Sequence, residues 1–289
     1  MQVSAAMADR ERRSRFTVLG AGGFIGKRLV DHLQRKGHEV SAVSRSDSLE
    51  YGRASGHVIF CIGLTEDYWK RPLDTAEAHV CALIPVLRRG SFESLVYLSS
   101  TRLYDGLKGT LDETSDLRVN PQNPRHVYDL SKAVGEALVH QAGLAGKVAR
   151  LANVYDDRLD REDFLCRTIQ RALRTNAFEV DAAPEGGRDY VHIEDVCTAV
   201  EAIALKGRHS TYNVATGKIF TNQQLAELCE RLLKCRMTFA GALADRPPKI
   251  NVRRLHDELG LHPLDASCRL PGILAALAAE RIGESTGSH

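Results

Sequence analysis

The sequence predicts an α/β protein in which a parallel sheet carries helices on both faces, followed by a smaller C-terminal α/β lobe. Three observations lead to this fold class. Short apolar runs alternate with amphipathic helical segments, a glycine cluster follows the first of those runs, and the regular pattern loosens beyond residue 153. Alternating strands and helices form parallel sheets because each helical crossover returns the chain to the sheet in the same direction.

The first β-α-β unit comprises a strand at 16–19, a helix at 24–36 that ends before Gly37, and a strand at 39–43. The next segment, 44–56, is too short for a full helix and strand, so we expect a trimmed crossover. Strands and helices then continue to alternate. The further expected elements are strands at 57–62, 94–98 and 147–152 and helices at 74–89 and 124–142.

We expect the C-terminal lobe to pack over the carboxyl edge of the sheet. The expected division is a dinucleotide-binding domain at 15–155 and a substrate-binding lobe at 156–282, with a return of the chain to the sheet near 190–215. The charged residues 1–14 and the residues 283–289 are predicted to be disordered. The lobe should contain helices at 160–175, 194–205, 221–234 and 271–281 and strands at 178–180, 211–214 and 236–239.

Composition excludes several function classes. The 289 residues include 39 Lys and Arg and 37 Asp and Glu, a formal net charge of +2, which argues against nucleic acid as a partner. No apolar run approaches the roughly 20 residues of a membrane helix and no secretory signal is recognisable, so we expect a cytoplasmic protein with no membrane partner. The seven cysteines lack zinc-binding spacing and are expected to be reduced thiols, and no metal site is predicted.

A glycine-rich run, GAGGFIG, connects the first strand to the first helix. Gly20 permits the tight turn, Gly23 lets a phosphate approach the backbone, and Gly26 allows the helix to pack closely against the strand. The pyrophosphate of a dinucleotide would bind at the helix N-terminus, beside Phe24 and Ile25. This context predicts a Rossmann-type dinucleotide site, and the alternative is a strand-to-helix turn without a ligand.

The residues after the second strand bear on the choice of cofactor. NAD sites usually carry an acidic residue there to bind the ribose hydroxyls, whereas here Ser44 and Arg45 follow the strand. A guanidinium can bind a 2′-phosphate, so NADP(H) is favoured and NAD is possible. The alternatives are that Arg45 is a solvated loop charge and that Asp47 binds the ribose. Gly63, after the next strand, completes the predicted cofactor contacts.

Tyr128 and Lys132 lie four residues apart and therefore on one face of a predicted helix. A free tyrosine has a pKa of about 10, and we expect Lys132 and a bound nicotinamide together to lower it toward neutrality. Tyr128 would then exchange a proton with a substrate oxygen while Lys132 holds the nicotinamide ribose. A hydroxyl of the run Ser99-Ser100-Thr101, at the carboxyl end of a predicted strand, can donate to the same oxygen, unless the run only caps the following loop.

Five patches in the expected order make the chain resemble the extended short-chain dehydrogenase/reductase superfamily, specifically its NAD-dependent epimerase/dehydratase family of nucleotide-sugar enzymes. The resemblance spans about residues 16–275. The patches are the glycine run, the sequence VYLSS with the following Leu103-Tyr104, the segment from Tyr128 to Lys132 with Glu136, the sequence RLANVY at 150–155, and the sequence GRDYVHIEDV at 187–196.

The resemblance implies that Ser100, Tyr128 and Lys132 are the catalytic residues. It also implies a nucleotide-sugar substrate and a homodimer formed through the helices at 74–89 and 124–142. Asn153 matches an asparagine near the substrate phosphates, and the arginines match contacts of the pyrophosphate. The implied substrate-binding residues are Thr101, Asn153, Arg188 and Arg246, although Arg246 could equally be a surface residue.

Two departures from the family pattern narrow the expected function. The 4,6-dehydratases carry an Asp-Glu pair after the catalytic threonine, but Thr101 and Arg102 follow Ser100 here, so dehydration is not expected. Asp156 replaces a usual glycine, which alters the local turn. We expect NADP(H)-dependent reduction of a keto group on a nucleotide-activated deoxysugar. The alternatives are a nucleotide-sugar 4-epimerase that uses the same residues and a non-catalytic dinucleotide sensor.

Overall fold

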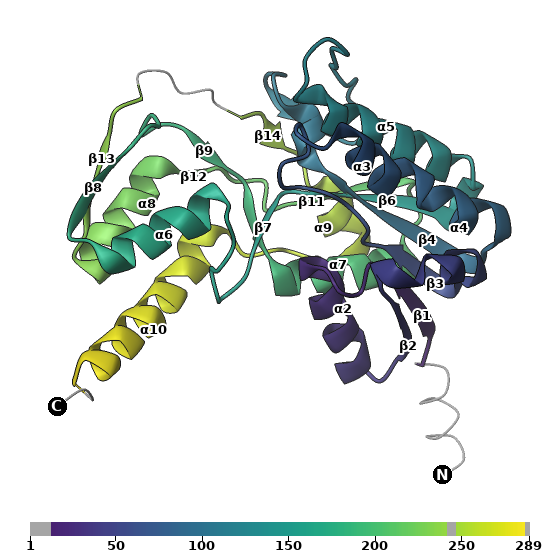
Figure 1. Cartoon of the computed structure of the whole chain (residues 1–289), viewed down its shortest axis with the longest axis horizontal. Helices are drawn as coiled ribbons and strands as arrows, with labels where there is room; N and C mark the ends of the chain where they lie inside the picture. Colours follow the sequence, from purple (N-terminus) through teal and green to yellow (C-terminus); the bar gives the residue numbers. More distant parts are fainter. Residues whose placement is uncertain (1–12, 242–246, 287–289) are drawn as a thin grey trace.

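The computed structural model describes residues 13–241 and 247–286. Its centre is a six-stranded parallel sheet with the strand order β11-β6-β4-β3-β1-β2 (Figure 1). The predicted doubly wound α/β fold is confirmed. The strand order reverses between β1 and β3, the place where such sheets bind ligands at the carboxyl ends of their strands. The strands are β1 Arg15–Leu19, β2 Glu39–Val43, β3 Ser55–Phe60, β4 Ser91–Ser100, β6 Gly146–Leu151 and β11 Thr211–Val214.

Apolar side chains of the sheet pack against helices on both faces, because successive residues of a strand point to opposite sides. Val18 of β1 belongs to the core beneath α2 (Phe24–Arg35) and α7 (Ile193–Lys206), whereas its neighbour Leu19 belongs to the core on the opposite face. The helices on that second face are α3 Pro72–Ala76, α4 Leu83–Arg89 and α5 His126–His140. A π-helical turn, Glu77–Cys81, links α3 to α4.

The crossover after β2 is short, as the sequence indicates. A 3-10 helix, Arg45–Arg53, takes the place of an α-helix before β3, and its buried Tyr51 belongs to the core on the α4 side of the sheet. Strand β4 ends at Ser100, two residues later than predicted. Ser44 and Ser100 therefore both lie at the carboxyl edge of the sheet, where β2 and β4 end.

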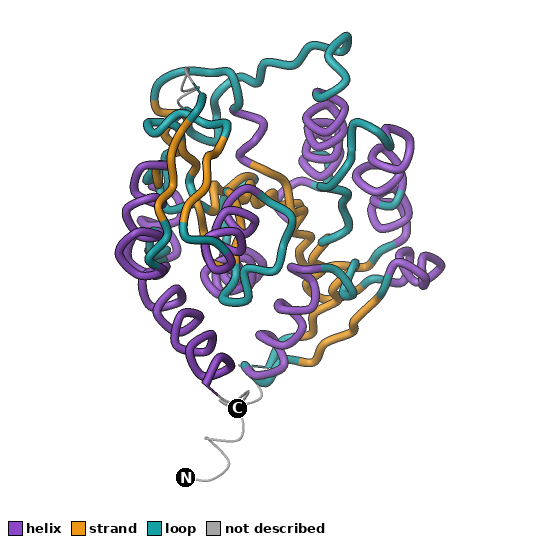
Figure 2. The backbone as a smooth tube through the Cα atoms, turned by 60° about the vertical axis from the view of Figure 1, so that its left-hand side comes forward, coloured by secondary structure: helices purple, strands orange, loops and turns teal. Residues whose placement is uncertain are grey.

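The C-terminal lobe has a core of its own. Leu165, Ile169 and Leu270 from its helices pack with Phe178 and Met237 from the parallel pair of β8 and β13. Figure 2, in which this lobe comes forward, shows the paired strands in orange beside the purple helices. The elements are α6 Phe164–Arg174, β8 Ala177–Val180, α8 Asn222–Leu228, β13 Arg236–Phe239 and α10 Ala266–Thr286.

Helix α10 is longer than the predicted 271–281 and continues to Thr286. The helix therefore includes residues 283–286, which the sequence predicts to be disordered. Extending an existing helix by one residue costs much less free energy than starting a new helix, so the helix continues past 281. Residues 287–289 lie outside the described part of the chain, as do residues 1–12 of the predicted leader. Despite its length, neither α10 nor any other described helix is apolar enough to cross a lipid bilayer.

Short strands join the sheet to the lobe. Strand β7 pairs in parallel with β10, β9 pairs antiparallel with β12, and β5 pairs in parallel with β14. Between β10 and β12 the chain returns to the sheet through α7 and β11, so the sheet part contains segments from both halves of the sequence, whereas the core of the lobe comes from the second half alone. The remaining elements are β5 Thr110–Leu111, β7 Asn153–Tyr155, β9 Gly187–Arg188, β10 Tyr190–His192, β12 Phe220–Thr221, β14 Lys249–Ile250 and α9 Arg253–Leu259.

Candidate active site

A cleft of about 520 Å³ lies at the carboxyl ends of β1, β3, β4 and β6 and is closed on its other side by residues of the lobe. A second cleft of about 510 Å³ lies between α2 and α7 and contains none of the predicted site residues. We assign the chemistry to the first cleft because the predicted groups converge there. Those that line it are Gly23, Phe24, Ile25, Gly63, Ser100, Thr101, Tyr128, Lys132, Asn153 and Arg188.

The glycine turn has the geometry that a dinucleotide requires. Gly20 has a φ of +85°, which favours glycine, and a β-carbon on Gly26 would lie only 2.2 Å from the carbonyl oxygen of Gly20. Gly23 caps α2 in an extended conformation, without a side-chain hydrogen bond to the first turn. The N–H groups of that turn therefore face the cleft beside Phe24 with no capping side chain, and they fit a pyrophosphate.

The tip of β2 carries a serine and a carboxylate that interact. The Ser44 hydroxyl donates to Asp47 Oδ2 at 2.7 Å, and the Ser44 backbone N–H reaches the same oxygen at 3.3 Å. Arg45 begins the 3-10 helix, and its side chain lies outside the described part of the structure, as does Arg246. The predicted ribose position therefore includes Asp47, which the sequence offered as an alternative to Ser44 and Arg45.

Lys132 reaches the cleft from the buried face of α5. Its Nζ donates to the carbonyl oxygen of Leu98 at 2.8 Å and lies 4.7 Å from the centroid of the Tyr97 ring. Burial lowers the pKa of Lys132 to about 7, against the opposing effect of the Glu136 carboxylate. The lysine is thus held at the end of β4, one helical turn past Tyr128.

Tyr128 is buried and lines the same cleft as Ser100, so the two predicted catalytic hydroxyls lie on one cleft. Burial raises the pKa of Tyr128 to about 12, while the Ser100 hydroxyl and the charge of Arg102 oppose this shift. The chain alone therefore does not bring this pKa toward neutrality. From the sequence, Lys132 and a bound nicotinamide together are expected to lower this pKa, and the positive charge of the nicotinamide is not supplied by the chain.

A buried ion pair and a hydrogen bond join α5 to β4 and β6. Glu136 of α5 accepts hydrogen bonds from Ser99 at 2.5 Å and from Arg150 Nη2 at 2.6 Å. Ser99 and Arg150 are register partners on β4 and β6, and the charged side chains are only 4% and 6% exposed. Glu136 therefore fixes α5 to the ends of two strands, directly beside Ser100.

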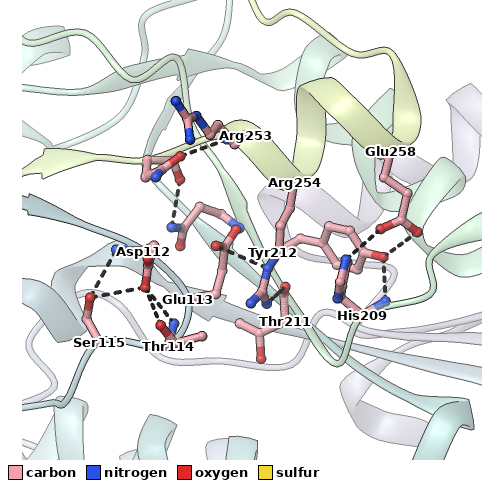
Figure 3. A network of polar contacts seen from close by, with 12 residues as sticks. Asp112, Glu113, Thr114, Ser115, His209, Thr211, Tyr212, Arg253, Arg254 and Glu258 are labelled. Atoms are coloured by element: carbon pink, nitrogen blue, oxygen red, sulfur yellow. Dashed lines mark hydrogen bonds and ion pairs between the residues drawn. The ribbon is translucent and has the colours of Figure 1, made fainter.

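This polar network continues to the end of the sheet. Arg150 donates to the Tyr104 hydroxyl at 2.7 Å, which in turn donates to Asn213 at 2.9 Å. The backbone N–H of Asn213 donates to Glu113 at 2.9 Å, and Glu113 pairs with Arg254 of α9 at 3.5 Å (Figure 3). The loop after β4 is thereby tied to β11 and α9.

Two arginines that the sequence analysis did not assign to the site also line the cleft, Arg102 and Arg161. The Arg161 guanidinium lies 4.3 Å from the centroid of the Phe24 ring, at the N-terminus of α2. It comes from the loop after β7, where no periodic pattern indicates a site. Arg102 was noted only as a departure from the dehydratase pattern, and its sequence neighbours Ser100 and Thr101 were the signal that could have identified it.

Asp156 stabilises the loop after β7, at a position where the family usually has glycine. Its Oδ1 accepts from the backbone N–H groups of Arg158 and Leu159 at 3.2 and 3.3 Å. Its Oδ2 pairs with Arg28 of α2 at 2.6 Å. The aspartate therefore closes the turn and joins the loop to α2, near Arg161.

Comparisons with known proteins agree with this geometry. The model of the NAD dependent epimerase/dehydratase family matches residues 16–215. A dTDP-glucose 4,6-dehydratase of Xanthomonas campestris pv. campestris (strain B100) is 27% identical over 271 residues, covering 85% of this chain and 72% of the relative.

Two solved structures share the fold. MoeE5 in complex with UDP-glucose and NAD has a TM-score of 0.76 at 23% identity, covering 94% of this chain and 99% of that chain. RMD from Pseudomonas aeruginosa, complexed with NADPH, has a TM-score of 0.74 at 22% identity with the same coverage. Since the family match includes the glycine turn, Ser100, Tyr128 and Lys132, the chain belongs to the NAD-dependent epimerase/dehydratase family of extended short-chain dehydrogenase/reductase enzymes.

Proposed function

We propose that this enzyme uses NADP(H) to reduce a keto group on a nucleotide-linked deoxysugar. The observation that carries the proposal is the convergence of Ser100, Tyr128 and Lys132 on the cleft that the N-terminus of α2 enters. A nicotinamide dinucleotide supplies the hydride when bound. Tyr128 donates the proton to the substrate oxygen, Ser100 polarises that oxygen, and Lys132 holds the ribose.

The lobe side of the cleft suits the diphosphate of a nucleotide sugar. Arg188 and Arg161 present guanidinium groups, which bind phosphate oxygens in a bidentate manner. Asn153 lines the same wall and is fixed by hydrogen bonds of its backbone and side-chain amides to the Asp189 carbonyl oxygen, at 3.0 and 3.2 Å. Arg246 and Thr101 complete the proposed substrate contacts, with Arg246 outside the described residues.

The NADP(H) preference depends on the charge at the tip of β2. Arg45 would bind a 2′-phosphate, whereas the Asp47 carboxylate would repel one. Asp47 therefore favours a second candidate function, a 4-epimerase that retains NAD and returns the hydride to the opposite face of the sugar. Both candidates use the same three catalytic residues.

Turnover assays separate the candidates. We expect the purified chain to consume NADPH when given a UDP-linked or dTDP-linked 4-keto-6-deoxyglucose, with one alcohol formed for each NADPH. Interconversion of UDP-glucose and UDP-galactose without added cofactor would instead establish the epimerase. Dinucleotide binding without either reaction would point to a sensor and overturn both proposals.

We also propose a homodimer formed through α3, α4 and α5. The support is the family resemblance together with exposed apolar side chains on two of these helices, where Leu73 is 83% and Val134 is 46% exposed. Light scattering should give twice the mass of 31.9 kDa. The double variant Leu73→Glu, Val134→Glu should be monomeric, and a monomeric wild-type protein would contradict the proposal.

A further inference from the structure

Three neighbours enclose the ring of Tyr128. The ring centroids of Tyr68 and His79 lie 5.2 and 5.1 Å from its centroid, and the Arg102 guanidinium carbon lies 5.2 Å from it. Each neighbour comes from a different element: the loop before α3, the π-helical turn after α3, and the 3-10 turn after β4. The position of the phenol is therefore determined by parts of the chain far apart in sequence.

Of the titratable groups in the described part of the chain that face Tyr128, three carry no charge. The pKa of the Tyr97 phenol is raised well above its ordinary value by burial, and Tyr68 is likewise a phenol. His79 is kept neutral, because burial lowers its pKa to about 2 and its two ring nitrogens bond to Ser131 and to the Leu64 N–H. The charged groups that face Tyr128 are Arg102, Asp129 and, on the next turn of α5, Lys132.

Of the two cations, Arg102 is the one whose charge is permanent. A guanidinium stays protonated at all accessible pH values, whereas burial lowers the pKa of Lys132 to about 7. The Lys132 ammonium donates to the carbonyl oxygen of Leu98 and lies over the Tyr97 ring. Arg102 is therefore the fixed positive charge on the phenol side of the cleft.

The fork of Arg102 is held in one orientation. Its Nε donates to Asp129 Oδ1 at 3.1 Å, its Nη2 reaches the carbonyl oxygen of Arg125 at 3.4 Å, and its guanidinium lies 4.5 Å from the Tyr68 ring centroid. Its backbone N–H donates to the Ser100 hydroxyl at 3.1 Å. One residue thus contacts Ser100, the first turn of α5 and the face of the catalytic ring.

We propose that Arg102 is a positioning residue for the reaction: it holds the Tyr128 ring in the cleft and supplies the fixed positive charge beside its phenol, a charge that Asp129 moderates. The proposal rests on the proposed function of Tyr128 as the proton donor. It also gives a role to the guanidinium that stands where the dehydratases carry an acidic residue.

Opposite substitutions in the ion pair test this role. Arg102→Gln removes the positive charge, so the limb of the pH–rate profile that reports Tyr128 ionisation should move to higher pH, by about one unit. Asp129→Asn keeps a hydrogen-bond acceptor for Arg102 but removes the opposing charge, so the same limb should move to lower pH. Arg102→Lys should restore much of the wild-type position. A merely structural ion pair would instead lower the rate in both variants and leave the limb in place.

A substrate-free measurement separates this proposal from the proposed reaction. Tyrosinate absorbance can be titrated in the complex with NADP⁺, with Tyr128→Phe as the blank, and it requires no turnover. Opposite shifts in Arg102→Gln and Asp129→Asn would support the role of Arg102 even if the reduction assay failed. Unchanged Tyr128 titration in both variants, with wild-type thermal unfolding and NADP⁺ affinity, would overturn it.

Discussion

The wall of the cleft that comes from the sheet is anchored by buried charges, whereas the wall that comes from the lobe presents exposed side chains on short strands. Ser100, Tyr128 and Lys132 stand in front of the Glu136–Arg150 pair, whose side chains are nearly inaccessible to solvent. Asn153 and Arg188 are exposed and lie on strands of three and two residues. The difference suggests that the proposed reacting groups are held rigidly, while the proposed substrate-binding surface can adapt.

The largest effect should come from the sheet wall. Tyr128→Phe removes the proton donor, so we expect turnover to fall by roughly 10²–10⁴-fold while the dinucleotide affinity stays unchanged. Steady-state assays and fluorescence titration with NADPH would measure the two quantities. Tyr68→Phe is the matched control, since it removes a phenol beside the same ring. Equal activity of the wild type and Tyr128→Phe would remove Tyr128 from the chemistry.

Breaking the buried Glu136–Arg150 ion pair should lower the free energy of unfolding as well as the turnover rate. Glu136→Gln leaves the Arg150 charge buried without a counter-charge, and we expect a loss of about 3–5 kcal/mol in the free energy of unfolding. Urea denaturation measures it. The double variant Glu136→Gln, Arg150→Met removes both charges and should recover part of the loss. A single variant as stable as the wild type would show that the pair does not anchor this wall.

On the lobe wall, substitutions should change binding and leave the fold intact. Arg188→Ala and Arg161→Ala each remove a proposed phosphate contact, so KM for the nucleotide sugar should rise roughly tenfold or more with little change in kcat or in thermal unfolding. Arg158→Ala, on the same loop as Arg161 but outside the cleft, is the control. If Arg161→Ala weakens NADPH binding instead, its partner is the cofactor pyrophosphate beside Phe24.

A further effect is a pH-dependent change in stability at Lys132. Burial lowers its pKa from 10.5 to about 7, so between these values the unfolded chain binds the proton more tightly and the stability of the wild type rises with pH. The variant Lys132→Met has no such titration. Its stability gain over the wild type should be greatest below about pH 7 and should fade toward pH 10.5. Thermal unfolding of the cofactor-free protein over this range would test it, and a difference independent of pH would contradict it.

The same contrast explains which residues could be predicted from the sequence. Tyr128, Lys132 and the hydroxyl run Ser99-Ser100-Thr101 follow from local rules, because a four-residue helical spacing and the end of a strand bring them to one edge of the sheet. The choice of Ser100 within that run follows from the family resemblance. Arg161 does not, since its place depends on the turn at Asp156 and on the ion pair of that residue with Arg28. No spacing rule relates residues that meet only through a loop.

The surroundings of Tyr128 were also beyond local rules. The helical spacing predicts Lys132 as the cation that acts on the phenol together with a bound nicotinamide. The contact of Arg102 with the phenol ring depends instead on Tyr68 and Asp129, which lie on separate elements. The extent of helix α10 was underestimated for a related reason, since its continuation beyond 281 reflects propagation of a helix already stabilised by the core of the lobe. Tertiary packing decides such features.

The most direct test of the account is the transfer of deuterium from NADPH labelled at C4 of the nicotinamide to a nucleotide-linked 4-keto-6-deoxyglucose. We expect the wild type to place deuterium on the new carbinol carbon, Tyr128→Phe to place almost none, and Tyr68→Phe to behave as the wild type. Deuterium transfer by Tyr128→Phe at the wild-type rate, or a wild type that binds NADPH and transfers none, would contradict the assignment of Tyr128 as the proton donor of a reductase.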